Sequence, residues 1–346
     1  GFALSVQAAR SLLRREVYAL AGDAEADVWA IGHTHIDVAW LWTFAQTREK
    51  VARSFPSMLY LLERYPDFLF MSSQPKLYAF LREENPAAYR EVQRRVREGR
   101  WEAEGGMWVE ADCNLPCGEA LIRQFVYGKR FFREELGVDS RVLWLPDVFG
   151  YSVALPQIMK RCGVDYFMTT KISWNDTNQL PVDTFLWEGL DGSRVLTHCV
   201  TTTSSYKLTP YLTSYNGEMT AEHVKGCYAR YQQKELSRDL LMCYGYGDGG
   251  GGTTIEQIET ARRFEQGVPG MPRVRHGKVL DFFRRLEQNL RGRSDVPVWV
   301  GELYLEYHRG TYTSMAIVKR LNRQCEQALM ELETLLPLTG TPAPRE

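Results

Sequence analysis

The stretch Ala30-Ile31-Gly32-His33-Thr34-His35-Ile36-Asp37-Val38-Ala39-Trp40 dominates the interpretation of this chain. It begins inside a short apolar run, residues 28–31, that is typical of a buried strand, so the polar cluster is expected where the strand opens into a loop. In extended backbone, the spacing of His33, His35 and Asp37 places all three side chains on one face. Imidazole and carboxylate groups are typical ligands of zinc and related divalent ions. The stretch therefore predicts a metal site, the alternative being a polar strand end with solvated histidines.

Length and composition limit the class of protein. The 346 residues can form one barrel-sized α/β domain or two smaller domains. The 42 Lys and Arg residues nearly balance the 43 Asp and Glu residues, so the net charge is close to zero. No nucleic acid or membrane partner is therefore expected. The seven cysteines are scattered without a CxxC pair, which favours a reducing, cytoplasmic setting. No run of 18 apolar residues and no signal-peptide pattern is present in the sequence.

Apolar periodicity predicts that strands and helices alternate along most of the chain. The predicted strands cover residues 28–31, 68–72, 101–109, 142–145, 165–169, 240–244 and 296–300. The main predicted helices cover residues 43–65, 87–98, 118–136, 155–162, 221–236, 254–265 and 279–290. Such alternation is typical of a parallel sheet or barrel, because parallel neighbours need long crossovers. Residues 184–187 and 194–200 flank a Gly-rich turn and predict an antiparallel hairpin inserted in this pattern.

Asp147 is the second carboxylate candidate. It directly follows the predicted strand 142–145, at the barrel rim where catalytic groups collect. Pro146 and Phe149 on either side would partly desolvate it. The alternative is an ordinary turn, in which Asp is common.

His308 is the best distant partner for the opening cluster. Alternation over residues 302–308 would place Glu302, Tyr304, Glu306 and His308 on one strand face. Such a face is costly to bury unless its groups bind something or one another. The remaining histidines are poorer candidates, in a hairpin strand, on a surface helix and in a basic stretch: His198, His223 and His276.

A glycine run at residues 245–252 follows another predicted strand and precedes a helix. It formally satisfies the dinucleotide fingerprint, but Asp248 lies inside the loop and would repel a pyrophosphate. Four consecutive glycines after Asp248 let the backbone approach a ligand while showing one carboxyl group, which could act as a general acid. Residues 201–217, rich in Thr, Ser and Tyr, are expected to form a substrate-facing loop.

Taken together, these motifs resemble the catalytic domain of glycoside hydrolase family 38, the retaining α-mannosidases. The matching segments are residues 32–40, 105–110, 144–152, 245–254 and 301–314, and they occur in the family's order. The chain looks most similar to the cytosolic, broad-specificity branch and its bacterial relatives. The resemblance covers residues 28 to 336.

The resemblance implies a role for each matched residue. The metal ligands would be His35, Asp37, Asp147 and His308, and His33 would support them without binding the ion. Asp147 would also be the nucleophile and Asp248 the general acid and base, while Trp40 and Phe149 would contact the sugar. A His and Asp ligand set suits zinc, with cobalt or manganese as alternatives. One departure is Arg309, where Golgi-type enzymes have an acid.

The same resemblance implies a fold and a reaction. The fold would be a distorted seven-stranded (β/α) barrel over residues 25–312. Before it, apolar positions at helical spacing predict a leader helix in residues 1–24. Residues 313–346 would begin a three-helix bundle whose exposed apolar face could support a homo-oligomer. The reaction would be the metal-dependent release of terminal α-mannosyl residues from a mannose-containing oligosaccharide by double displacement.

Three other functions remain open at this point. A metal-dependent amidohydrolase or deacetylase would use a metal-activated water, but it would need more histidines on later strands. A nicotinamide-dependent enzyme would have to use the glycine run. A non-catalytic carbohydrate-binding domain would account for the nine Trp and 18 Tyr residues.

Overall fold

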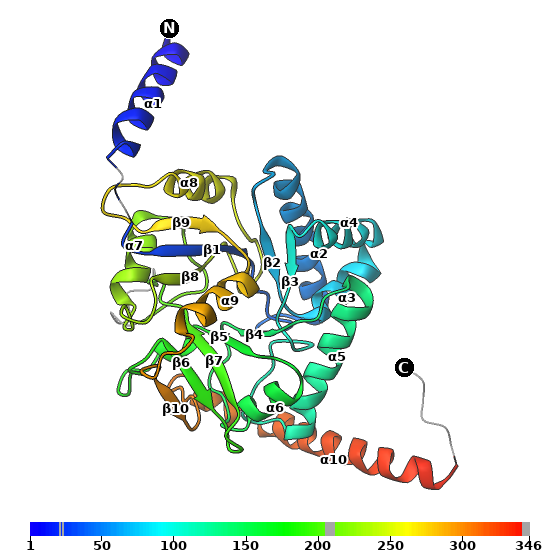
Figure 1. The fold of residues 1–346 in the computed structure, drawn as a ribbon. Coiled ribbons are helices and arrows are strands. Elements are labelled where there is room, and N and C mark those ends of the chain that lie inside the picture. The colour runs from blue at the N-terminus through cyan, green and yellow to red at the C-terminus, as the bar shows by residue number, and fades with distance from the viewer. Residues whose placement is uncertain (21, 23, 205–211, 341–346) are drawn as a thin grey trace.

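A computed structural model describes residues 1–20, 22, 24–204 and 212–340 (Figure 1). In this part of the chain, ten strands form two sheets of five strands each. The strands are β1 (Asp27–His33), β2 (Phe70–Ser72), β3 (Trp101–Ala103), β4 (Val142–Leu145), β5 (Tyr166–Thr169), β6 (Thr184–Glu188), β7 (Arg194–Cys199), β8 (Asp239–Tyr244), β9 (Arg273–His276) and β10 (Val298–Val300).

Helices connect most of these strands, as the alternating pattern predicts. The α-helices are α1 (Phe2–Tyr18), α2 (Phe44–Arg64), α3 (Pro75–Glu84), α4 (Pro86–Arg97), α5 (Gly118–Leu136), α6 (Leu155–Arg161), α7 (Ala221–Arg230), α8 (Ile255–Glu265), α9 (Val279–Leu290) and α10 (Ala316–Leu338). Two short 3₁₀ helices are η1 (Lys171–Ser173) and η2 (Arg309–Tyr312). Thr43 and Thr254 form capping boxes that begin α2 and α8, and each such cap stabilises a helix by about 1 kcal/mol.

The first sheet has the order β3-β2-β1-β8, with β9 also paired to β1, and all these pairs are parallel. Asp27–Ala30 of β1 pair with both β8 and β9, whereas Gly32 and His33 pair with β2. Since a strand has two edges, β9 and β2 share one edge of β1 and diverge along it. The stretch 273–276, which we did not predict as a strand, fills the first half of this edge.

The second sheet has the order β10-β6-β7-β5-β4. Its β6–β7 pair is antiparallel, which confirms the predicted hairpin, and its other pairs are parallel. A single bridge between Gly105 and Leu143 connects the end of β3 to β4. The mixed α/β architecture with parallel strands is as expected, but a seven-stranded barrel is not what the described residues show. The strands are divided between two sheets because, among the described residues, β3 and β4 form no ladder beyond this single bridge.

Two clusters of core residues lie on the two faces of the first sheet, and a third packs around the second sheet. Side chains of α2 and α8 pack against one face, with Val51, Phe55 and Ile258 fully buried. The opposite face packs against β4, β5 and α9, where Trp144 and Phe283 are fully buried. Residues of β1, β4 and β8 therefore share one buried layer, and the loops that follow these strands lie at one end of it.

Two predicted strands differ from the structure. Residues 101–109 form a strand only as far as Ala103, because Gly105 and Gly106 turn the chain with φ angles of 150° and 79°. Residues 302–308 form no named strand, although Leu303 bridges Tyr151 and both Leu303 and Leu305 are buried. The alternation there reflects which side chains are buried and does not reflect sheet pairing.

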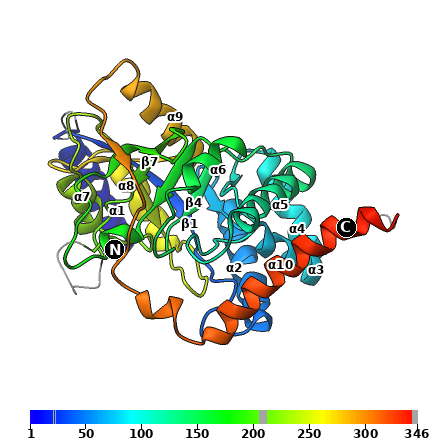
Figure 2. The same ribbon diagram turned by 90° about the horizontal axis from the view of Figure 1, so that it is seen from below.

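The terminal helices lie at the periphery of the molecule. No side chain of α1 is buried, and α1 projects away from the sheets (Figure 1). The long helix α10 runs past α5 at the edge of the molecule (Figure 2), where Arg123 pairs with Glu333. The predicted division at residues 24 and 312 stays a prediction. No helix among the described residues is both long enough and apolar enough to cross a membrane.

Candidate active site

His35 lies just beyond the end of β1, and its side chain is 3% exposed. Its Nε2 atom is 3.3 Å from Asp37 Oδ1, and its Nδ1 atom is 2.8 Å from Glu110 Oε2. Burial by itself lowers the pKa of His35, but the Glu110 and Asp37 carboxylates outweigh burial and raise the pKa well above its ordinary value. His35 is therefore an imidazole held between two acids.

Asp248 comes from the glycine-rich loop after β8 and lies beside the same stretch. The Asp37 amide donates to the Asp248 carbonyl at 3.1 Å, and Ile36 bridges Gly249. The Tyr215 hydroxyl donates to Asp248 Oδ1 at 2.5 Å. Burial, together with Asp147 and Asp248, raises the pKa of Tyr215 well above its usual value, so this hydroxyl stays protonated as a donor.

Asp147 follows β4 and approaches from the second sheet. Lys171, at the start of η1, places its ammonium nitrogen 2.5 Å from Asp147 Oδ1. The Lys171 side chain is 7% exposed, and its ammonium also lies 4.0 Å from the centre of the Trp174 ring. This contact neutralises one side of the Asp147 carboxylate and fixes its orientation.

The structure brings three predicted site residues together from the two sheets. Ligand atoms of His35, Asp147 and Asp248 all lie within 4.8 Å of one another. Asp37 joins this group through its contact with His35. We refer to these four residues as the polar cluster.

His308 does not lie within this compact group. It is exposed, has a φ angle of 65° at the start of η2, and places its ring 5.5 Å from the ring of Phe149. Burial and Lys171 lower the pKa of His308, and Asp147 opposes them, so the three side chains are close enough to interact electrostatically. The prediction that a strand face presents His308 is wrong, because the segment turns here with a positive φ.

Hydrogen bonds from side chains to backbone groups hold the segment that contains His308. The Glu306 carboxylate accepts hydrogen bonds from three successive amides, those of residues 176–178, at 2.7 to 2.9 Å. The Asn175 side chain donates to the Tyr304 carbonyl and accepts from the Glu306 amide. The segment is thus fastened to the loop after η1 by side-chain contacts, beside Lys171.

Trp40 and Phe149, the predicted sugar contacts, closely follow Asp37 and Asp147 in the chain. Trp40 is 65% exposed and meets Trp42 edge to face, with ring centres 5.6 Å apart. Phe149 packs between the rings of His308 and Tyr312. Both rings thus belong to the segments that carry Asp37 and Asp147, and aromatic surface of this kind suits contact with the apolar face of a sugar.

His33 is the last residue of β1, and its environment differs from that of His35. It is 1% exposed, and its Nε2 accepts a hydrogen bond from Trp144 Nε1 at 3.2 Å. Burial and the charge of His35 lower the pKa of His33 to about 3. The His33 ring is therefore neutral, and its acceptor nitrogen, Nε2, already accepts the hydrogen bond from Trp144.

The residues of the cluster fit a divalent cation. Although His35 lies close to two carboxylates, neither of its ring nitrogens has a well-aligned hydrogen-bond partner among the described residues, and Glu110 Oε2 also lacks one. Ligand atoms on a tetrahedral zinc ion lie about 3.3 Å apart, given bonds of about 2.0 Å. The separation of 3.3 Å between His35 Nε2 and Asp37 Oδ1 matches this value.

The glycine run is shaped by the chain's own packing. Gly250 and Gly252 have φ angles of 82° and 76°. An added Cβ at Gly252 would lie 2.6 Å from the sulfur of Met58, and one at Gly250 would overlap the Ser54 hydroxyl. Since the loop lies directly on α2, these glycines serve that packing, which argues against a dinucleotide site.

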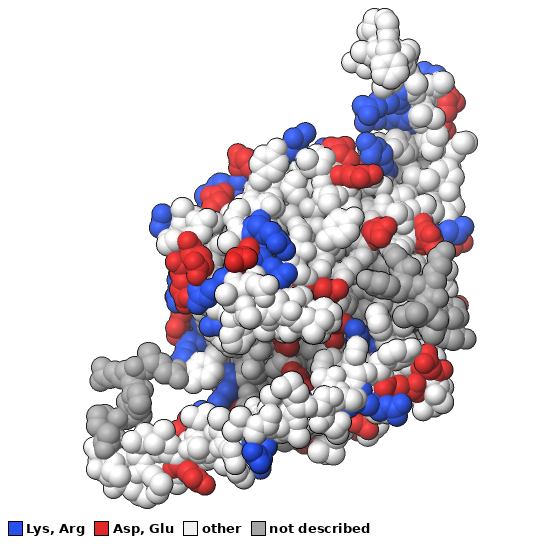
Figure 3. All heavy atoms as spheres, turned by 180° about the vertical axis from the view of Figure 1, so that it is seen from behind, with Lys and Arg blue, Asp and Glu red and all other residues white. Residues whose placement is uncertain are grey.

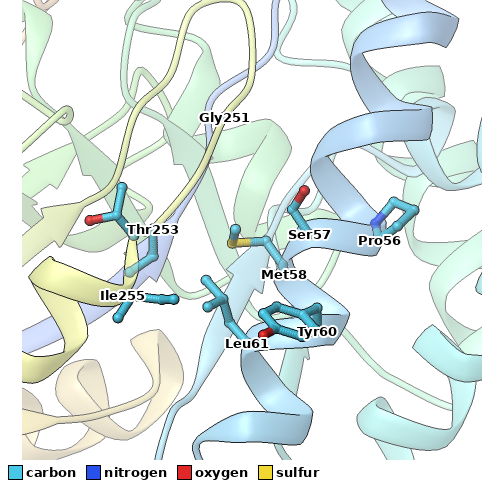
Figure 4. Close-up of a pocket in the computed structure, with 9 residues that line it drawn as sticks. Pro56, Ser57, Met58, Tyr60, Leu61, Gly251, Thr253 and Ile255 are labelled. Atoms are coloured by element: carbon cyan, nitrogen blue, oxygen red, sulfur yellow. The ribbon is translucent and has the colours of Figure 1, made fainter.

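A separate pocket of about 490 Å³ lies between α2 and this loop (Figure 4). Figure 4 shows Met58 and Leu61 of α2 facing Thr253 and Ile255. None of the polar-cluster residues lines it. The pocket is thus behind the loop that carries Asp248 and is not the predicted active site.

Sequence reasoning missed three residues of the site. Glu110 closes a matched motif, yet nothing local distinguished it from other acids. Lys171 lies just beyond β5, at a strand end where site residues collect, and this position could have indicated it. Tyr215 lies in the predicted substrate-facing loop, of which residues 205–211 are outside the described residues.

The structure also groups Asp67, Glu265 and His276 away from the polar cluster. Both acids are exposed, and Asp67 is already ion-paired with Arg262 at 2.9 Å. This group is therefore a poorer cation site than the polar cluster. Charges on the face in Figure 3 are interspersed without a large patch of one sign, consistent with the near-zero net charge.

Comparison with known proteins gives the family. The model of the N-terminal domain of family 38 glycosyl hydrolases matches residues 25–302. Alpha-mannosidase G of Dictyostelium discoideum is 42% identical over 90% of this chain and 28% of its own length. Human alpha-mannosidase 2C1 is 41% identical over 92% of this chain and 29% of its own length.

A solved structure shows the same fold. An alpha-mannosidase from Enterococcus faecalis V583 superposes with a TM-score of 0.64 at 18% identity, over 80% of this chain and 31% of that chain. The chain thus spans less than a third of the length of each of these three proteins. The resemblance inferred from the motifs is confirmed, and the chain belongs to the glycosyl hydrolases of family 38.

Proposed function

We propose that this chain is the catalytic N-terminal part of a metal-dependent retaining α-mannosidase that removes terminal α-mannosyl residues from oligosaccharides. The relatives named above are alpha-mannosidases. The main support is the approach of Asp147 and Asp248, whose nearest carboxylate oxygens lie within 4.8 Å. Retaining glycosidases hold their two carboxyl groups about 5 Å apart, whereas inverting enzymes separate them further to admit a water.

In the first step, an Asp147 carboxylate oxygen attacks the anomeric carbon while the bond to the leaving oxygen breaks. Asp248 donates its proton to that oxygen, so the aglycone departs neutral and a covalent mannosyl ester remains on Asp147. Lys171 holds the Asp147 carboxylate for this attack through its 2.5 Å contact.

In the second step, the Asp248 carboxylate accepts a proton from water as the water attacks the anomeric carbon. The ester bond breaks, Asp147 regains its negative charge, and mannose leaves with its original configuration. The Tyr215 hydroxyl, 2.5 Å from Asp248 Oδ1, orients this carboxylate in both steps.

His35, Asp37 and Asp147 would hold the metal ion, and His308 would join them by a movement of its segment. When bound, a divalent ion such as zinc, or alternatively cobalt or manganese, would clamp sugar hydroxyls and favour distortion of the ring. We place the protein in the cytoplasm, since all seven cysteines are free thiols.

The amidohydrolase alternative has weaker support. A water-activating site is typically built from several histidines, but among the described residues only His35 shares the compact group with the two aspartates. A non-catalytic sugar-binding role would not require two carboxylates at this spacing.

The direct test is to trap the ester. A 2-fluoro-mannosyl fluoride should add one fluoromannosyl mass to the chain, located on the peptide that contains Asp147, and Asp147→Ala should abolish the adduct. The same variant should abolish hydrolysis of an aryl α-mannoside. An adduct elsewhere, or turnover retained by Asp147→Ala, would refute the assignment.

A further inference from the structure

Glu110 lies on the opposite side of the His35 ring from Asp37. Its Oε2 atom is 2.8 Å from His35 Nδ1, whereas Asp37 Oδ1 is 3.3 Å from His35 Nε2. The side chains of His35 and Glu110 are only 3% and 5% exposed. Glu110 is thus shielded from solvent behind the ring and is not placed to contact a substrate.

The corner between β2 and α3 holds Glu110 from two directions. The Ser73 hydroxyl donates to Glu110 Oε1 at 2.7 Å, and the Glu110 amide donates to Gln74 Oε1 at 3.1 Å. Gln74 also donates from Nε2 to the Ile36 carbonyl at 2.9 Å, next to His35. With a φ angle of 58°, Gln74 has an uncommon backbone conformation that directs its side chain between these two segments.

This arrangement distinguishes the two ring nitrogens. The 2.8 Å contact is not a well-aligned hydrogen bond, but the Glu110 carboxylate at this distance favours the tautomer that carries its proton on Nδ1, so the lone pair of Nε2 is directed toward Asp37 and the rest of the cluster. A carboxylate behind a ligand histidine also raises the basicity of the ring, and loss of such a partner typically weakens metal affinity about 10- to 100-fold.

We propose that Glu110 is the positioning residue of the metal site: it fixes the tautomer and orientation of His35, with Ser73 in support, and thereby sets the affinity for the ion. The inference rests on the proposed metal-dependent function. It assigns a role to the acid that ends the motif at residues 105–110, in which no ligand or catalytic residue has been assigned.

The test measures Zn²⁺ affinity by competition with a chromophoric chelator, using the chain before and after substitution. Glu110→Gln should weaken binding about 10-fold and Glu110→Ala about 100-fold. Ser73→Ala should have a smaller effect in the same direction. Glu102→Gln is the matched control, because this acid on β3 accepts from the α9 amides of Val279 and Leu280 and does not contact His35.

Nitrogen NMR of the His35 imidazole in the zinc-loaded chain provides a reading that a general loss of stability would not change. Protonated Nδ1 and ligated Nε2 are expected, with a second ring form emerging in Glu110→Gln. Ser73→Ala gives an independent answer if the Glu110 variants do not fold. If Glu110→Gln and Ser73→Ala both kept the original zinc affinity and a single ring form, this inference would be overturned, while the proposed metal dependence would stand. Failure of the unsubstituted chain to bind zinc would overturn both the inference and the proposed metal dependence.

Discussion

The two halves of the site are built differently. The half on the first sheet, His35, Asp37 and Asp248, is joined by backbone contacts, since the Asp37 amide binds the Asp248 carbonyl and Ile36 bridges Gly249. The half around His308 is exposed at His308 itself and, apart from the backbone bridge between Leu303 and Tyr151, is held by the side chains of Glu306 and Asn175. Backbone pairing fixes a position more firmly than exposed side-chain contacts, which can exchange with water. We therefore expect the first half to be prearranged and the second to be the half that moves when an ion binds.

The largest expected difference between the halves is in metal binding. His35→Ala should weaken Zn²⁺ binding at least about 100-fold, because it removes a buried ligand, while His308→Ala should weaken it about 10-fold or less. Chelator competition on both variants measures this difference. Equal losses would show that the exposed half is as preorganised as the buried one.

Glycines test the packing of each half. Gly250→Ala should lower the free energy of unfolding by about 3 kcal/mol, because Gly250 has a φ angle of 82° and an added Cβ would overlap Ser54. Gly310→Ala is the matched control, since the nearest atom to its added Cβ is 4.0 Å away and its φ is not positive. Urea unfolding of both variants gives the comparison, and similar losses would contradict it.

Acid stability should depend on the buried half. The folded pKa of His33 is about 3, below the ordinary 6.5, because of burial and the charge of His35. The unfolded chain therefore binds a proton first, and stability is lost as pH falls from 6.5 toward 3, by up to about 1.4 kcal/mol per pH unit for this group. His33→Gln should reduce this slope in metal-free protein, as followed by urea unfolding between pH 7 and 4. His308→Gln should reduce the slope less, because His308 is exposed and Asp147 opposes the lowering of its pKa, and the opposite ranking would contradict the buried role of His33.

The smallest effect is expected at Trp40. Trp40→Ala should raise KM for an aryl α-mannoside about 5-fold with little change in kcat, because this ring is 65% exposed and would contribute stacking alone. Steady-state kinetics, with Trp42→Ala for comparison, would test this. A large fall in kcat would mean that Trp40 positions the sugar for attack.

Local signals predicted most of the elements around the site. The helices at residues 118–136 and 279–290 and the strand at 142–145 have the predicted bounds, because apolar periodicity and end signals agreed there. The strand at 273–276 was missed, since only its pairing with β1 makes it a strand. The segment at 302–308 has a strand-like pattern because buried and exposed residues alternate in it, although only Leu303 bridges another segment.

The residues of the candidate site also differ in whether the sequence indicated them. His35, Asp37, Asp147 and Asp248 were singled out from residue type and position after a strand, and the structure brings them together. Their roles stay predictions. Glu110, Lys171 and Tyr215 were not identified, because what distinguishes them is the group that each contacts across the fold.

The sequence by itself determined the family, the alternation of strands and helices, and the positions of the polar residues after strand ends. These features depend on near neighbours in the chain or on motif order, so they can be read without coordinates. Only the tertiary structure decided that the strands form two sheets, that Lys171 and Glu110 pair with Asp147 and His35, and that His308 lies apart. These outcomes depend on contacts between segments distant in sequence, whose geometry no local pattern encodes.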